Sequence, residues 1–145
     1  MVKLINKLKN RKGFTLIELI VVLAVLAVIM AIAVPRFLGV QENAKISADY
    51  STAAMLGKAA ELYLANDDNT ITKLNTEAAK GASALATELN TTTIEFKSGA
   101  FDGQEDTINF SETNGVVSVT VTASKGYTAP DGTTKSAAAQ QLYPQ

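Results

Sequence analysis

An almost unbroken apolar segment lies near the start of the chain. Residues 14–34 form 21 positions, of which only Thr15 and Glu18 are polar. At a rise of about 1.5 Å per residue, a helix of this length roughly matches the hydrocarbon core of a bilayer. The pattern predicts a transmembrane helix over residues 14–35. Because a carboxylate in a bilayer core costs about 2.5–3.5 kcal/mol, we expect Glu18 to have a partner.

A helical pattern continues beyond Pro35 to about Leu64. Two apolar stripes follow it on opposite sides: Phe37, Val40, Ala44, Ala48, Met55, Ala59 and Leu62 form one, and Ile46, Tyr50, Ala53, Gly57 and Leu64 form the other. We expect one stripe to pack on the chain's own head and the other on neighbouring helices. The alternative is a single wide stripe that faces the core. Pro35 has no N–H to bond the carbonyl of Ala31, so a kink is predicted there.

The remaining sequence predicts a small head with one further helix and an antiparallel sheet. The long helix should end in the turn-forming run at residues 66–69, and a second helix is predicted over residues 76–88. Apolar and polar residues then alternate, as is typical of strands, around Ile94 and Phe96, around Ile108 and Phe110, and along residues 117–121. The tail, residues 125–145, should wrap the sheet edge or remain mobile. The fold class is therefore α+β, with residues 36–145 as the head.

One turn fixes the expected register of the sheet. The pair Asn114–Gly115 is typical of a two-residue type I′ hairpin. With that turn, three pairs lie opposite each other: Thr113 with Val116, Phe110 with Val119, and Ile108 with Val121. Because the apolar residues face one another, turn chemistry and pattern agree on an antiparallel sheet, which we expect to pack on the C-terminal half of the long helix.

Charge is distributed unevenly along the chain. Residues 1–13 carry five basic residues and no acid, while the other 132 residues carry eight bases and fourteen acids. A basic segment before an apolar helix stays in the cytoplasm, so the head is expected on the far side of the membrane. The acidic head has no basic patch that would favour nucleic acid.

Several kinds of chemistry lack their usual residues. The chain has no His and no Cys, so the commonest general bases, thiol nucleophiles and zinc sites are missing. We therefore expect neither an enzyme nor a cofactor. Asp102, Glu105 and Asp106 offer oxygen ligands suited to calcium, but their spacing differs from the twelve-residue calcium loop, so solvated turns are the default interpretation and no metal site is assigned.

The strongest motif is Lys12-Gly13-Phe14-Thr15-Leu16-Ile17-Glu18, which follows the basic leader and opens the apolar helix. It closely resembles the type IV prepilin signature. The resemblance implies that a prepilin peptidase removes residues 1–13 by cutting between Gly13 and Phe14, and that Phe14 is N-methylated. It also implies that Glu18 neutralises the new amino terminus, at Phe14, of a neighbouring subunit.

The resemblance further implies a structural subunit of a type IV pilus. Such a subunit waits as a single-pass protein in the cytoplasmic membrane with its N-terminus inside. Assembly machinery then extracts it, and identical subunits polymerise through their apolar helices into a cell-surface filament for adhesion or motility. Residues 14–35 would be the membrane-spanning and filament-core part of the helix.

Two other interpretations remain open. A pseudopilin of a type II secretion or DNA-uptake system carries the same N-terminal signature. An ordinary secretory signal cut after Ala33 would instead release a soluble binding domain. Three features oppose the secretory interpretation. The apolar run is longer than that of a usual secretory signal, Glu18 lies inside it, and Pro35 would become the second mature residue.

Overall fold

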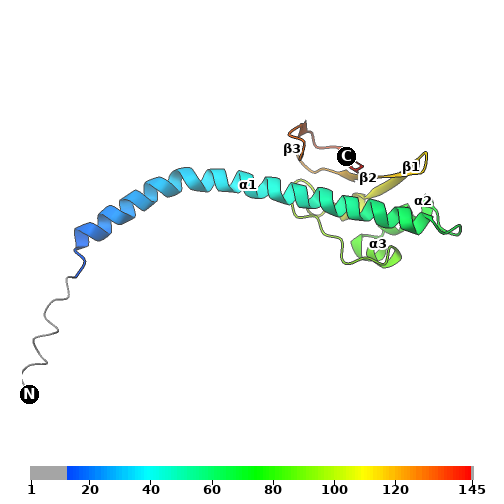
Figure 1. Ribbon diagram of the computed structural model, residues 1–145, viewed down its shortest axis with the longest axis horizontal. Helices are drawn as coiled ribbons and strands as arrows, with labels where there is room; N and C mark the ends of the chain where they lie inside the picture. Colours follow the sequence, from blue (N-terminus) through cyan, green and yellow to red (C-terminus); the bar gives the residue numbers. More distant parts are fainter. Residues whose placement is uncertain (1–12, 145) are drawn as a thin grey trace, which may run out of the picture. The chain divides into compact units, whose positions relative to one another are not determined.

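The structure is a computed structural model that describes residues 13–144. Its longest element is helix α1, Leu16–Leu64, which runs through Pro35 without interruption (Figure 1). Two compact units share this helix: the first ends at Leu38, and the second, from Gly39 onward, contains the head. The predicted end of the helix at the turn-forming run is confirmed, since residues 66–69 form turns directly after α1.

The head covers one face of the second half of α1. The residues of α1 that it buries are Ile46, Asp49, Tyr50, Ala53, Leu56, Gly57 and Ala60. On the other stripe Val40 is 68% exposed and Leu62 is 75% exposed, although Ala59 is half-buried. The chain therefore covers one of the two predicted apolar stripes and leaves most of the other open. The alternative of a single wide core-facing stripe is wrong.

The predicted second helix over residues 76–88 is wrong, because two short helices occupy this region. Helix α2, Ile71–Ala78, begins where the Thr70 side chain accepts a hydrogen bond from the Lys73 N–H. Helix α3, Ala82–Glu88, follows Gly81, whose φ of +108° interrupts the helical path. A backbone with this φ is readily adopted only by glycine, so Gly81 separates the two helices.

The main sheet has three antiparallel strands in the order β1-β2-β5: β1 is Asn109–Thr113, β2 is Val116–Thr122 and β5 is Ala139–Tyr143. Asn114 and Gly115 have φ of 55° and 80°, as a type I′ turn requires. The predicted pairs Thr113–Val116 and Phe110–Val119 are both confirmed. Ile108 lies just before β1, after the short 3₁₀ helix η2, Glu105–Thr107, so its predicted pairing with Val121 falls outside the strand ladder and stays a prediction.

One further segment differs from the prediction, while the tail lies at the sheet edge, as one of its two predicted alternatives has it. Ile94 and Phe96 are buried but belong to no strand, since the N–H of Phe96 donates to the Glu105 side chain and not to a neighbouring strand. The tail supplies strand β5 at the edge of the main sheet. Before β5, the short strands β3, Tyr127–Thr128, and β4, Thr134–Lys135, pair with each other.

Carboxylates of α1 hold the loop that precedes the sheet. Asp49 is buried, and its two oxygens accept hydrogen bonds from the N–H groups of Lys97 and Ser98 at 2.7 and 2.9 Å. About two helical turns earlier, Glu42 accepts from the N–H of Gly99 at 2.7 Å. Three successive backbone donors outside any regular element are thus satisfied by acids of the helix, which ties the head to α1.

The last strand is seated on α1 by a close approach. A Cβ at Gly57 would collide with the ring of Tyr143, so the ring lies directly against the helix backbone. The hydroxyl of Tyr143 then donates to Glu61 at 3.1 Å, one turn further along α1. Glycine at position 57 is therefore needed for space and not for its backbone freedom.

We predict opposite effects for the same substitution at two glycines of α1. Gly57→Ala should lower the thermal unfolding midpoint of the detergent-solubilised chain, because displacing the Tyr143 ring costs about 1–3 kcal/mol. Gly39→Ala should raise the midpoint, because alanine favours a helix over glycine by up to about 1 kcal/mol and nothing lies within 4 Å of the added Cβ. Adding Tyr143→Ala to Gly57→Ala should remove the clash. A midpoint that rises in Gly57→Ala as it does in Gly39→Ala would show that the ring does not lie on this helix.

Candidate functional site

The residues of the N-terminal motif lie at the start of α1. Gly13, Phe14 and Thr15 precede the helix, which begins at Leu16. Phe14 is 88% exposed, and nothing lies within 4 Å of the position that a Cβ on Gly13 would take. The described chain itself therefore places no steric demand for glycine at position 13. Residues 1–12, the rest of the predicted leader, lie outside the described residues.

Thr15 and Glu18 bind each other across the first turn. The Oε2 atom of Glu18 accepts hydrogen bonds from the N–H of Thr15 at 2.8 Å and from its hydroxyl at 2.7 Å. In return, the N–H of Glu18 donates to the Thr15 hydroxyl at 3.3 Å. This reciprocal arrangement is a capping box, in which a Thr and a Glu three residues later satisfy backbone donors that the helix leaves unpaired.

The capping box uses only half of the acceptor capacity of Glu18. Within residues 13–144, both hydrogen bonds to its carboxylate go to Oε2. Oε1 therefore remains open to a further donor, such as a positively charged amine. The Phe14 nitrogen would become such an amine if the bond after Gly13 were cut, and the open oxygen is available to an amine from another chain.

The apolar part of α1 that follows this cap is exposed throughout. The large hydrophobic residues from Leu16 to Val34 are between 43% and 76% exposed. This part of α1 is not buried inside the head, and the helix is long and apolar enough to cross a membrane. Together with the motif that precedes it, this surface is consistent with anchoring in a membrane.

The other sequence candidates lie apart from this motif. Pro35 is within α1, and the kink predicted there stays a prediction. The bond after Ala33 also lies in the interior of α1. Glu105 accepts the N–H of Phe96, while Asp102 and Asp106 are exposed. In the part of the chain from residue 13 to residue 144, no three acidic side chains gather in a way that could hold a metal ion.

Two features of the site region were missed at the sequence level. The spacing of Thr15 and Glu18 matches the Thr-x-x-Glu pattern of a capping box, and this signal was present in the sequence. The role of Asp49 was not predicted, because its partners, the N–H groups of Lys97 and Ser98, lie far away in the sequence. An acid on the head-facing side of a helix was the available sign that the head offers it backbone donors.

Comparisons with known proteins agree with the motif. A family model described as the prokaryotic N-terminal methylation motif matches residues 8–34. Over 76 residues the chain is 37% identical to "Prepilin peptidase-dependent protein A" of Clostridium perfringens (strain 13 / Type A). That alignment covers 50% of this chain and 54% of the relative, so the chain spans about half the length of the curated relative that it matches. No solved structure matches the chain.

The family model matches the N-terminal part of the chain, where it coincides with the capped and exposed helix described above. The type IV pilins and pseudopilins that share such a motif are structural proteins and not enzymes. The chain thus carries a type IV prepilin signature at residues 8–34, and its matches support the type IV pilin and pseudopilin family.

Proposed function

We propose that the chain is the precursor of a type IV pilin, a structural subunit that polymerises into a cell-surface filament. The observation that carries this proposal is the exposed apolar half of α1, which begins with a glutamate that keeps one carboxylate oxygen open. A membrane anchor explains the apolar surface and the helix cap, but it leaves the open oxygen of Glu18 without a partner. A filament subunit uses both.

The apolar surface needs two environments in succession. Before assembly, residues 16–34 lie in the bilayer with the basic leader in the cytoplasm. During assembly, the same surface leaves the lipid and is covered by the helices of neighbouring subunits. Packing against other helices keeps an apolar surface away from water as lipid does. The subunit can therefore pass from the membrane to the filament without exposing this surface to water.

The uncovered stripe of the second half of α1 extends this interface. Hydroxyl groups near it donate to carbonyls one turn earlier: Ser47 to Asn43, Ser51 to Ser47, and Thr52 to Ala48, at 3.0, 2.9 and 3.2 Å. Side chains that satisfy themselves in this way can be buried against another helix without losing a hydrogen bond. Val40, Met55 and Leu62 supply exposed apolar contacts on the same part of the helix.

Processing creates the charge that Glu18 meets. Cleavage after Gly13 leaves an amine at Phe14, which is close to the capping box in sequence. In the assembled filament, we propose that Oε1 of Glu18 receives the Phe14 amine of a neighbour while Oε2 keeps its bonds to Thr15. An ion pair formed in an apolar core is strongly favoured over two separate buried charges, so it selects the correct stagger between subunits.

Substitution at Gly13 tests the proposed processing site. In cells that contain prepilin peptidase, Gly13→Ala should leave the precursor uncut, while Gly39→Ala should be processed normally. Neither added methyl meets another atom within 4 Å, so a difference between them reports recognition by the peptidase and not misfolding. Intact mass spectrometry of the membrane fraction measures the mature N-terminus. A mature chain starting at Phe14 in the Gly13→Ala variant would refute this processing site.

The second prediction separates charge pairing from helix capping. Glu18→Gln retains a side chain that can serve in a capping box but removes the charge, whereas Thr15→Ala removes the cap and keeps the carboxylate. Both variants should be processed at Gly13. We expect Glu18→Gln to yield no filaments by electron microscopy and Thr15→Ala to yield them, because capping alone contributes only about 0.5–2 kcal/mol. Normal filaments from Glu18→Gln would contradict the pairing.

Shearing filaments from the cell surface distinguishes a pilin from a pseudopilin, which carries the same kind of N-terminal motif. A pilin should be recovered as a main component of long sheared filaments, and a pseudopilin should remain with the membrane. Cleavage after Ala33 would give neither result, since it releases a soluble head without residues 14–33.

A further inference from the structure

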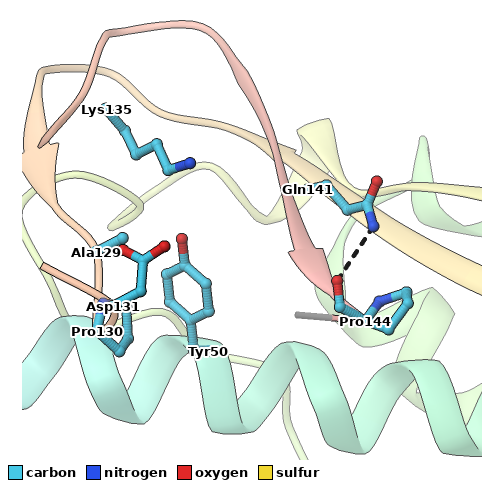
Figure 2. Close-up of a pocket in the computed structure, with 7 residues that line it drawn as sticks. All are labelled: Tyr50, Ala129, Pro130, Asp131, Lys135, Gln141 and Pro144. Atoms are coloured by element: carbon cyan, nitrogen blue, oxygen red, sulfur yellow. Dashed lines mark hydrogen bonds between the residues drawn. The ribbon is translucent and has the colours of Figure 1, made fainter. Parts of the chain in front are cut away.

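The head contains a cavity of about 280 Å³ that the proposed filament function does not use. It lies within the second compact unit, between α1, the connection from β3 to β4, and the end of β5 (Figure 2). Its walls combine rings with polar side chains; the residues that matter below are Tyr50, Pro130, Asp131, Lys135, Gln141 and Pro144. The volume is slightly below the roughly 300–1,000 Å³ typical of pockets for drug-sized ligands, so a single small ring is the right scale.

Several polar atoms around this cavity have hydrogen-bonding capacity left. Within residues 13–144, the ammonium of Lys135 has neither a salt bridge nor a hydrogen bond, and Figure 2 shows it extending over the space beside Tyr50. Asp131 accepts two bonds from Thr133 through Oδ1, at 2.8 and 2.7 Å, which leaves Oδ2 open. Gln141 donates from Nε2 to the carbonyl of Pro144 at 3.1 Å, which leaves its Oε1 open.

The charges of the cavity argue against a simple ion as its ligand. Hydrogen bonds from Thr133 lower the pKa of Asp131, so this carboxylate is ionised at neutral pH. The cavity therefore presents one positive and one negative side chain. An anion attracted to Lys135 would be repelled by Asp131, and a cation would meet the opposite conflict.

A neutral polyhydroxyl ligand resolves this conflict. Each hydroxyl both donates and accepts, so it can bind the ammonium of Lys135 and the open oxygens of Asp131 and Gln141 at once. The rings of Tyr50 and the two prolines give apolar walls for the C–H face of a sugar ring. The Tyr50 hydroxyl is held by that of Tyr127 at 2.9 Å, which fixes this wall before any ligand arrives.

We propose that this cavity binds one neutral saccharide unit, with Lys135, Asp131 and Gln141 as its hydrogen-bonding side chains. Binding here would add sugar recognition to the head. It needs neither cleavage at Gly13 nor assembly through Glu18, so it can be tested independently of the proposed filament function.

Saturation-transfer difference NMR on the full chain tests this proposal. The protein is kept in a phosphocholine detergent, because detergents with sugar headgroups would compete. Methyl glycosides of glucose, galactose and N-acetylglucosamine are the probes, with acetate as the anionic comparison. We expect at least one glycoside to give a signal and acetate to give none. Absence of signal from all three glycosides, or a signal from acetate alone, would overturn the proposal.

Matched variants place the binding in this cavity. Lys135→Gln should weaken glycoside binding about tenfold, as expected for the loss of a hydrogen bond to a charged group. Lys58→Gln, which removes an exposed lysine of α1, should leave it unchanged. If Lys135→Gln fails to fold, Asp131→Asn serves instead, because Asn keeps the acceptor for Thr133, and Asp68→Asn is its control. Equal binding by a cavity variant and its control would overturn the proposed site.

Discussion

Apolar surface that the chain cannot bury by itself is the constraint on which the rest of the structure depends. The first half of α1 is exposed on every side, and the second half is covered on only one. In water this surface would be strongly unfavourable, at about 25 cal/mol for each Å² left exposed. The helix therefore needs lipid or other helices around it. We propose that the basic leader and Glu18 help to place this helix first in lipid and then against other helices.

The head has to hold α1 firmly while leaving one side of it free. It does so with a narrow set of contacts, all on one face of the helix. Asp49 and Glu42 bind three successive N–H groups of the loop at residues 97–99, and Gly57 admits the ring of Tyr143. Because the acids satisfy backbone donors that no strand satisfies, the loop can be irregular and still bury Ser98 against the helix. Most apolar residues on the opposite face of α1 remain exposed.

Local rules were enough to predict the features that depend on neighbouring residues. The apolar run and the Asn114–Gly115 turn act over a few residues, so the long helix, its end near residue 64 and the register of β1 with β2 were all predictable. The division of α2 from α3 was harder. A helical pattern continues across Gly81, and only the positive φ adopted there reveals the break.

Features that depend on distant contacts could not be predicted. Strand β5, near the end of the tail, pairs with the distant strand β2. Ile94 and Phe96 alternate with polar residues as in a strand, but the N–H of Phe96 binds the Glu105 side chain instead. At the N-terminus, the motif spans only a few residues and could be recognised from the sequence, while the roles of Gly13, Phe14 and Glu18 stay predictions. The open oxygen of Glu18 was not, because it follows from how Thr15 occupies the other one.

The measurement that tests the central claim most directly is intact mass spectrometry of filaments sheared from cells that express this chain. A dominant species that starts at Phe14 and is one methyl group heavier than the unmodified chain is the result that the account predicts. It would show that the mature chain begins with a processed amino terminus just before the exposed helix, and that this chain is abundant in the filament. Filaments without this chain, together with a soluble form that starts at Val34, would contradict the account.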